Sequence, residues 1–219
     1  MPVYFDIHTH RIHPAAHSIY SISVHSGFTV PERAGYFSAG IHPWQTEISF
    51  RELLYDLEGL CRTGKLISVG EIGIDKLRGA SGSVQETIFQ AQVALAAQYK
   101  LPLIIHCVKA SDRLIAILRN EQVKVPVIIH GFQSGWKQAV KYLDEGFFLS
   151  FGSALLRNGN IACSVFLNVP SDRFFLETDE YTGGIETIYC AAARLLGTTP
   201  KNLGDNVMNR VKQIFRINE

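Results

Sequence analysis

The sequence has 219 residues, of which 47% are hydrophobic and 19% charged, which is typical of a globular protein with a sizeable core and excludes a disordered chain. Lys and Arg number 21 against 20 Asp and Glu, so the net charge of +1 gives no long-range field that would attract a polyanion. The length suits one domain, and we expect residues 1–219 to form it.

The cysteines and the N-terminal residues indicate in which cellular compartment the protein resides. The four cysteines are widely separated and form no C-x-x-C pair: Cys61, Cys107, Cys163 and Cys190. Such cysteines indicate free thiols in a reducing compartment. Asp6 and His8 interrupt the first apolar run, and no apolar run is long enough to span a membrane. The sequence therefore predicts a cytoplasmic protein that does not associate with a membrane.

Eight short apolar runs predict eight buried β-strands. In chain order they are Val3–Ile7, Ile19–Val24, Tyr36–Ile41, Leu66–Val69, Leu103–Ile105, Val125–Ile129, Phe147–Phe151 and Phe174–Leu176. Longer segments with helical spacing follow most of them, namely Phe50–Arg62, Val84–Tyr99, Ser111–Asn120, Gly135–Glu145, Ile185–Leu196 and Pro200–Arg216, the last with Thr199 as its N-cap.

A strand followed by a helix, repeated along the chain, predicts an α/β fold with a parallel sheet. Eight strands in a chain of this length favour a single compact, distorted (β/α)8 TIM barrel over a doubly wound sheet. Between His10 and Tyr36 the sequence has room for a strand but shows no helical pattern. We therefore expect an abbreviated first crossover.

Histidines and acidic residues recur where the predicted strands end at their carboxyl side. They are His8, His10, His42, Glu71, His106, His130 and Asp179. In a barrel these strand ends converge, so residues far apart in sequence can lie together. Because alternate side chains of a strand share a face, the H-x-H spacing places His8 and His10 on the same side. The pattern predicts a metal site, although each residue alone is as compatible with helix capping or a buried polar contact.

Imidazole and carboxylate ligands suit Zn²⁺, Mn²⁺ or Fe²⁺, and they suffice for two ions if one carboxylate bridges. Such ions activate a water molecule and polarise a phosphoryl or carbonyl oxygen, which predicts a hydrolase. His42 exceeds the number of ligands that two ions need. We expect it to orient a ligand or to face the substrate.

Seven stretches of the sequence together resemble the TatD-type metal-dependent hydrolases of the amidohydrolase-like superfamily. They are FDIHTH (5–10), AGIHPW (39–44), SVGEIGID (68–75), LPLIIHC (101–107), VIIHGF (127–132), FFLSFG (147–152) and FFLETD (174–179). They occur in the order of that family and span nearly the whole chain.

The resemblance implies a distorted barrel that binds one or two divalent ions, Zn²⁺, Mn²⁺ or Mg²⁺. One ion would be bound by His8, His10 and Asp179. The other would be bound by His106 and His130, with Glu71 as the bridge. Asp179 would also accept the proton of the attacking water, and the reaction would be hydrolysis of phosphodiester bonds in DNA, as in a deoxyribonuclease or exonuclease.

The sequence departs from the family pattern at residues that concern the substrate. Val108 stands where members of the family commonly have a phosphate-binding Arg, and Lys109 beside it is a candidate replacement. Glu180 adds a negative charge next to Asp179 that would repel a phosphate unless its side chain turns away.

The preferred function is a divalent-metal-dependent hydrolase that acts on phosphodiester bonds of DNA or of a small substrate. The departures leave two alternatives: a metal-dependent hydrolase of a cyclic amide or lactone, and a metal-binding barrel with little catalysis that serves as a binding module. For a nucleic-acid substrate, Trp44, Phe132 and Tyr181 are candidate stacking surfaces for a base, with packing of a loop as the alternative. No protein partner is inferred.

Overall fold

The computed structural model describes residues 3–11, 17–25, 28–30, 35–45 and 50–217. Within these residues one sheet of eight strands runs in the order β1 to β8. The strands are β1 (Phe5–Thr9), β2 (His17–Ser23), β3 (Tyr36–Gly40), β4 (Leu66–Asp75), β5 (Leu103–Val108), β6 (Val127–Ile129), β7 (Phe148–Phe151) and β8 (Phe174–Leu176).

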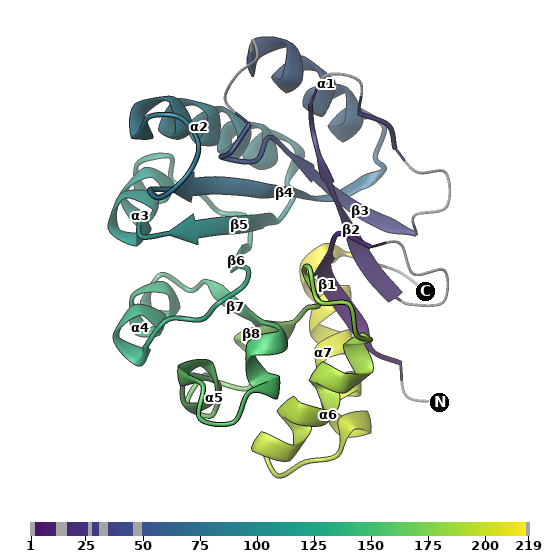
Figure 1. Cartoon of the computed structure of the whole chain (residues 1–219). Coiled ribbons are helices and arrows are strands. Elements are labelled where there is room, and N and C mark those ends of the chain that lie inside the picture. The colour runs from purple at the N-terminus through teal and green to yellow at the C-terminus, as the bar shows by residue number, and fades with distance from the viewer. Residues whose placement is uncertain (1–2, 12–16, 26–27, 31–34, 46–49, 218–219) are drawn as a thin grey trace. The chain divides into compact units, whose positions relative to one another are not determined.

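The helices follow the strands along the chain (Figure 1). They are α1 (Phe50–Arg62), α2 (Gly82–Tyr99), α3 (Ser111–Asn120), α4 (Trp136–Asp144), α5 (Ile161–Phe166), α6 (Ile185–Leu195) and α7 (Pro200–Phe215), with a 3-10 turn, η1 (Ser153–Leu156), before α5. No helix in the described part of the chain is both long and apolar enough to cross a membrane.

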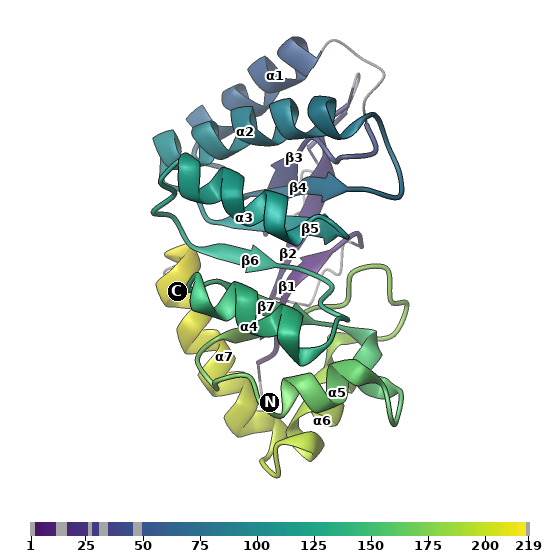
Figure 2. The same cartoon turned by 90° about the vertical axis from the view of Figure 1, so that its left-hand side faces the viewer.

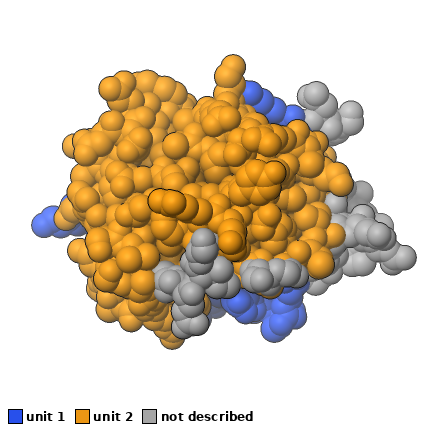
Figure 3. Space-filling model, turned by 90° about the horizontal axis from the view of Figure 1, so that it is seen from above, with its two compact units in different colours: residues 1–20, 129–219 blue, residues 21–128 orange. Residues whose placement is uncertain are grey.

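The chain forms two compact units, coloured separately in Figure 3. Unit 1 comprises Met1–Tyr20 and Ile129–Glu219, and unit 2 comprises Ser21–Ile128. The chain passes from one unit to the other within β2 and again within β6.

In unit 1, β1 has neighbours on both of its edges. It pairs in parallel with β2, with Phe5 opposite His17. On the other side a parallel bridge joins Thr9 to Asp179, just beyond β8, and β7 pairs in parallel with β8. The last strand of the chain thus returns to the first.

In unit 2 the strands follow one another in sequence order. The backbone N–H of Val24, just after β2, donates to the carbonyl of Gly40 in β3 at 2.8 Å. β3 pairs in parallel with β4, and β4 pairs in parallel with β5.

A sheet whose order follows the sequence, and whose last strand returns to the first, is the strand arrangement of a (β/α)8 barrel, so the predicted fold class is confirmed. No helix occurs among the described residues between β1 and β3, as the abbreviated first crossover predicts.

Most elements match the sequence expectation, and α1 and α3 match it to the residue. Thr199 caps α7 by accepting the Asn202 N–H at 3.1 Å, as predicted. Two elements were missed, η1 and α5, because SALL and IACSVF are too short to show a helical period. All four cysteines are free thiols, in agreement with the prediction.

Buried polar side chains tie the helices to the strands within each unit. In unit 1, where α6 and α7 pack together, the Tyr189 hydroxyl donates to the Phe5 carbonyl at 2.9 Å. In unit 2, where α1 and α2 lie side by side (Figures 1 and 2), the Gln92 side chain accepts the Ile41 N–H at 2.6 Å and donates to its carbonyl at 3.1 Å. The Gln92 contacts hold the segment that leads to His42.

Candidate metal centre

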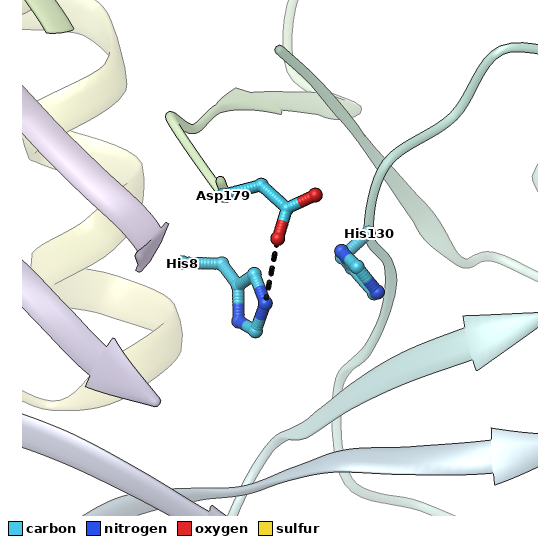
Figure 4. Close-up of side chains that lie close together, drawn as sticks. All are labelled: His8, His130 and Asp179. Carbon is cyan, nitrogen blue, oxygen red and sulfur yellow. Dashed lines mark ion pairs between the residues drawn. The ribbon is translucent and has the colours of Figure 1, made fainter. Parts of the chain in front are cut away.

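Unit 1 brings three of the predicted ligands together (Figure 4). His8 lies in β1, His130 follows β6 and Asp179 follows β8. The nearest ligand atoms of the three side chains all lie within 4.8 Å of one another. A metal ion of ordinary coordination distances could therefore contact all three after small side-chain adjustments.

His10 joins the same group, as the H-x-H spacing predicts. Asp179 Oδ1 lies 3.7 Å from Nε2 of His8 and 3.5 Å from Nε2 of His10. The centroids of the two imidazole rings are 5.0 Å apart, and the ring planes are nearly perpendicular. His8 is completely buried, whereas about a third of the His10 side chain is exposed, so the group extends from the core of unit 1 to its surface.

The position of Asp179 depends on hydrogen bonds with β1. Its backbone N–H donates to the His8 carbonyl at 2.9 Å, and its φ of 54° lies in the left-handed region that Asp adopts more readily than most residues. The preceding residue, Thr178, donates its backbone N–H to Asp6 at 3.0 Å and its hydroxyl at 2.5 Å. Burial raises the pKa of Asp6 to about 7, against the lowering effect of the Thr178 hydrogen bonds.

Glu177, for which the sequence predicts no role, is fully buried beside His130. Its Oε1 accepts the Gly131 N–H at 2.5 Å and lies 3.7 Å from Nδ1 of His130. Burial acts to raise the pKa of Glu177, but the neighbouring His130 and His8 rings lower it below its usual value. Carboxylates commonly hold the orientation of metal-binding histidines, so Glu177 is placed to do this for the candidate ligand His130. The visible signal was an acidic residue directly after an apolar strand.

Unit 2 forms a second group from His42, Glu71 and His106, whose ligand atoms also lie within 4.8 Å of one another. Oε1 of Glu71 lies 2.8 Å from Nδ1 of His106 and 3.2 Å from Nε2 of His42. The expectation that Glu71 ends a strand is wrong. β4 continues to Asp75 because the segment after Glu71 pairs with β5, Gly73 opposite His106 and Asp75 opposite Val108.

His42 is placed to orient Glu71. The backbone N–H of Trp44 donates to Nδ1 of His42 at 3.2 Å, so a neutral His42 carries its proton on Nε2, the atom that faces Glu71. His42 also belongs to the group of potential ligand atoms with Glu71 and His106, so its role beside the ligands remains a prediction.

Asp75 lies beside the unit 2 group, and the sequence did not predict a role for it. Its Oδ2 accepts the indole N–H of Trp44 at 2.7 Å and lies 3.2 Å from Nε2 of His106. Burial acts to raise the pKa of Asp75, but the hydrogen bonds from Trp44, Leu77 and His106 lower it below its usual value. The signal was the two-residue period of a strand, because Glu71, Gly73 and Asp75 share one face of β4.

The other candidate substrate-facing residues divide between exposed and buried positions. Lys109 and Glu180 are exposed, and Trp44 is 45% exposed. Tyr181 is half-buried. The proposal of a stacking role for Phe132 is wrong, because this ring is buried and packs edge-on against Tyr142 and Phe151.

The structure thus gathers His8, His10, His130 and Asp179 in unit 1, and His42, Glu71 and His106 in unit 2. Both groups combine imidazole nitrogens with a carboxylate. This donor set fits a divalent metal of the first transition row, and Asp75 and Glu177 supply the outer carboxylates that commonly hold metal-binding histidines.

The chain is similar to a family model, to curated sequences and to solved structures. The model of the family "TatD related DNase" matches residues 29–189. The chain is 33% identical over 146 residues to a "3'-5' ssDNA/RNA exonuclease TatD" of Edwardsiella piscicida, covering 65% of this chain and 56% of that protein. It is 31% identical over 147 residues to the "Uncharacterized metal-dependent hydrolase YabD" of Bacillus subtilis, covering 66% of this chain and 58% of that protein.

Two solved structures share the fold. The TatD homologue YjjV of Escherichia coli superposes with a TM-score of 0.83 at 19% identity, covering 98% of both chains. A TatD-family hydrolase of Entamoeba histolytica superposes with a TM-score of 0.76 at 15% identity, covering 97% of this chain and 98% of that one.

The matched sequence spans little more than half the length of the two curated relatives. The family model, in contrast, covers most of this chain and includes Glu71, His106, His130 and Asp179. The chain belongs to the TatD related DNase family.

Proposed function

We propose that the protein is a divalent-metal-dependent hydrolase that cleaves phosphodiester bonds of single-stranded nucleic acid. The observation that carries this proposal is the group formed by His8, His130 and Asp179, whose ligand atoms lie within 4.8 Å of one another. The name of the Edwardsiella piscicida relative supports the substrate class, because it describes a nuclease for single-stranded DNA and RNA.

A bound divalent ion would supply Lewis acidity, polarising a phosphoryl oxygen and lowering the pKa of a water molecule. In unit 1, His8, His10 and Asp179 would hold one ion. The other ligands predicted from the sequence are His106, His130 and Glu71, and their assignment to a second ion remains a prediction.

The chain's own residues would position the reactants and move the proton. The Asp179 carboxylate would accept the proton of the attacking water at Oδ2, while Oδ1 faces the two imidazoles of the H-x-H pair. His42 would keep Glu71 oriented through its Nε2 proton. Lys109 and Trp44, both solvent-accessible, would face the substrate.

A panel of substrates tests the proposal. The protein is stripped of metal, reloaded with Mn²⁺, Mg²⁺ or Zn²⁺, and assayed on single-stranded DNA, RNA, bis-p-nitrophenyl phosphate and a set of lactones. We expect hydrolysis of the phosphodiesters, its loss with chelator, and a fall in kcat larger than the change in KM for Asp179→Asn. An unchanged rate in Asp179→Asn would remove this residue as the proton acceptor.

A lactone or cyclic-amide substrate is the second candidate. The apolar Val108 and the net charge of +1 favour it, because neither attracts a phosphate. Turnover of lactones without phosphodiester hydrolysis would establish this alternative, and metal binding without turnover of any substrate would indicate a binding module.

A further inference from the structure

Arg78 is a cation held against an aromatic ring next to the metal-ligand group of unit 2. Its guanidinium carbon lies 4.7 Å from the centroid of the Trp44 ring. The Arg78 side chain is exposed and forms no ion pair with a carboxylate of the described residues. A guanidinium that rests its face on an aromatic ring keeps its N–H groups directed outward at its edge.

The turn that carries Arg78 is held by hydrogen bonds to Gln85 and by close packing against Pro43. The Gln85 side-chain amide, buried beneath it, lies within 3.0 Å of the carbonyl oxygens of Asp75, Arg78 and Ala80. Gly79 has a φ of 86°, and a side chain there would overlap the Pro43 carbonyl oxygen. The backbone at Gly79, next to Arg78, therefore packs against the carbonyl group of Pro43, next to Trp44.

Trp44 connects Arg78 to the candidate ligands. Its indole N–H donates to Oδ2 of Asp75 at 2.7 Å, and the same oxygen lies 3.2 Å from Nε2 of His106. Arg78 contacts the Trp44 ring, so one aromatic side chain links its guanidinium to the Asp75 carboxylate beside His106.

The same turn lies next to Val108. The backbone N–H of Lys76 donates to the Val108 carbonyl at 3.1 Å, so the turn from Lys76 to Arg78 begins beside the end of β5. The turn that carries Arg78 therefore starts at the strand end where the sequence has the apolar Val108.

We propose that Arg78 binds a phosphate group that flanks the scissile phosphate of a single-stranded nucleic acid, and that Trp44 is the positioning residue that holds its guanidinium. The proposal rests on the nuclease function proposed above. The planar edge of a guanidinium donates two parallel hydrogen bonds to phosphate oxygens, which suits a backbone contact that is independent of base sequence.

The test measures kcat and KM of the metal-loaded full chain on oligo-dT over a series of NaCl concentrations. For Arg78→Ala we expect KM to rise roughly tenfold to a hundredfold with kcat little changed, since a charged hydrogen bond is lost. The slope of log KM against log salt should become shallower by about 0.7, the value for one phosphate contact of a single strand. Arg78→Lys should retain the slope, and Trp44→Ala should raise KM in the same direction as Arg78→Ala.

Two controls separate this contact from general effects. Lys124→Ala removes one exposed charge just before β6, at the opposite end of the strands, and should leave KM and the salt slope unchanged. Bis-p-nitrophenyl phosphate has no flanking phosphate, so Arg78→Ala should hydrolyse it at the wild-type rate, which also shows that the variant is folded and loaded.

The possible results distinguish the role of Arg78 from the proposed function. A wild-type KM and salt slope in Arg78→Ala, or an equal loss in Lys124→Ala, would overturn the role of Arg78 while the nuclease function stands. Loss of bis-p-nitrophenyl phosphate hydrolysis in Arg78→Ala would overturn the flanking position. A wild-type protein that cleaves no single-stranded nucleic acid would overturn the proposed function and this inference with it.

Discussion

The Asp6 carboxylate accepts two hydrogen bonds from Thr178, one from the hydroxyl at 2.5 Å and one from the backbone N–H at 3.0 Å. Both residues are buried and lie 172 positions apart in the sequence. Through this pair, β1 holds the segment that carries Asp179 beside His8. The geometry of the unit 1 ligand group therefore depends on a contact that binds no metal itself.

Thr178→Val removes the hydroxyl while keeping the shape of the side chain. Because the buried Asp6 then loses a donor, we expect the free energy of unfolding to fall by about 1–3 kcal/mol and metal affinity to weaken. Urea denaturation and calorimetric titration with Mn²⁺ measure the two effects. Thr187→Val, at an exposed position of α6, is the matched control and should change neither. Wild-type values for both quantities in Thr178→Val would contradict the positioning role.

Gly73→Ala tests the close pairing of β4, which carries Glu71, with β5, which carries His106. Gly73 has a φ of 151°, and an added Cβ would overlap the His106 carbonyl oxygen. We expect a loss of stability on the order of 3 kcal/mol from the clash and the strained backbone. Gly59→Ala in α1, where no atom lies within 4 Å of the added Cβ, should instead stabilise the protein by about 0.5–1 kcal/mol. Thermal denaturation should show opposite shifts, and a neutral Gly73→Ala would refute the close approach of β4 and β5.

Arg210→Met tests how α7 supports β8. The Arg210 guanidinium donates to the carbonyls of Phe174 and Ser171 and lies over the rings of Phe174 and Phe175. Removing the donors leaves the Phe174 carbonyl without this partner, so we expect stability to fall by about 1–3 kcal/mol. Arg194→Met, exposed at the end of α6, should stay within about 0.5 kcal/mol of wild type. Equal midpoints of urea unfolding for the two variants would show that Arg210 has no structural role.

The sequence predicted most strands and helices well, because the spacing of apolar residues within each of these elements is regular. The order of eight strands and the bounds of α1 and α3 follow from that period. It also predicted the contact of His8 and His10, because the H-x-H spacing on a strand determines which side the two rings face.

The sequence did not predict features that depend on partners distant along the chain. β4 extends past Glu71 because β5 pairs with it, and Phe132 is buried because Tyr142 and Phe151 cover it. The role of Glu177 beside His130 likewise depends on a contact across 47 positions, which no local pattern contains. The sequence thus predicted the candidate ligands, but it did not predict that the carboxylates of Asp75 and Glu177 lie beside their histidines.

The proposed function requires that the two candidate ligand groups bind divalent metal and that this metal supports hydrolysis. Equilibrium dialysis against Mn²⁺, followed by elemental analysis and assay on single-stranded DNA, tests it in wild type, His130→Ala and Glu71→Ala. His17→Ala, an exposed histidine that begins β2, serves as the control. In the two ligand variants we predict less bound metal and a loss of turnover larger than the roughly tenfold to hundredfold loss caused by removing a partner of a ligand. The control should behave as wild type. Wild-type metal content and turnover in both folded ligand variants would contradict metal-dependent hydrolysis at these groups.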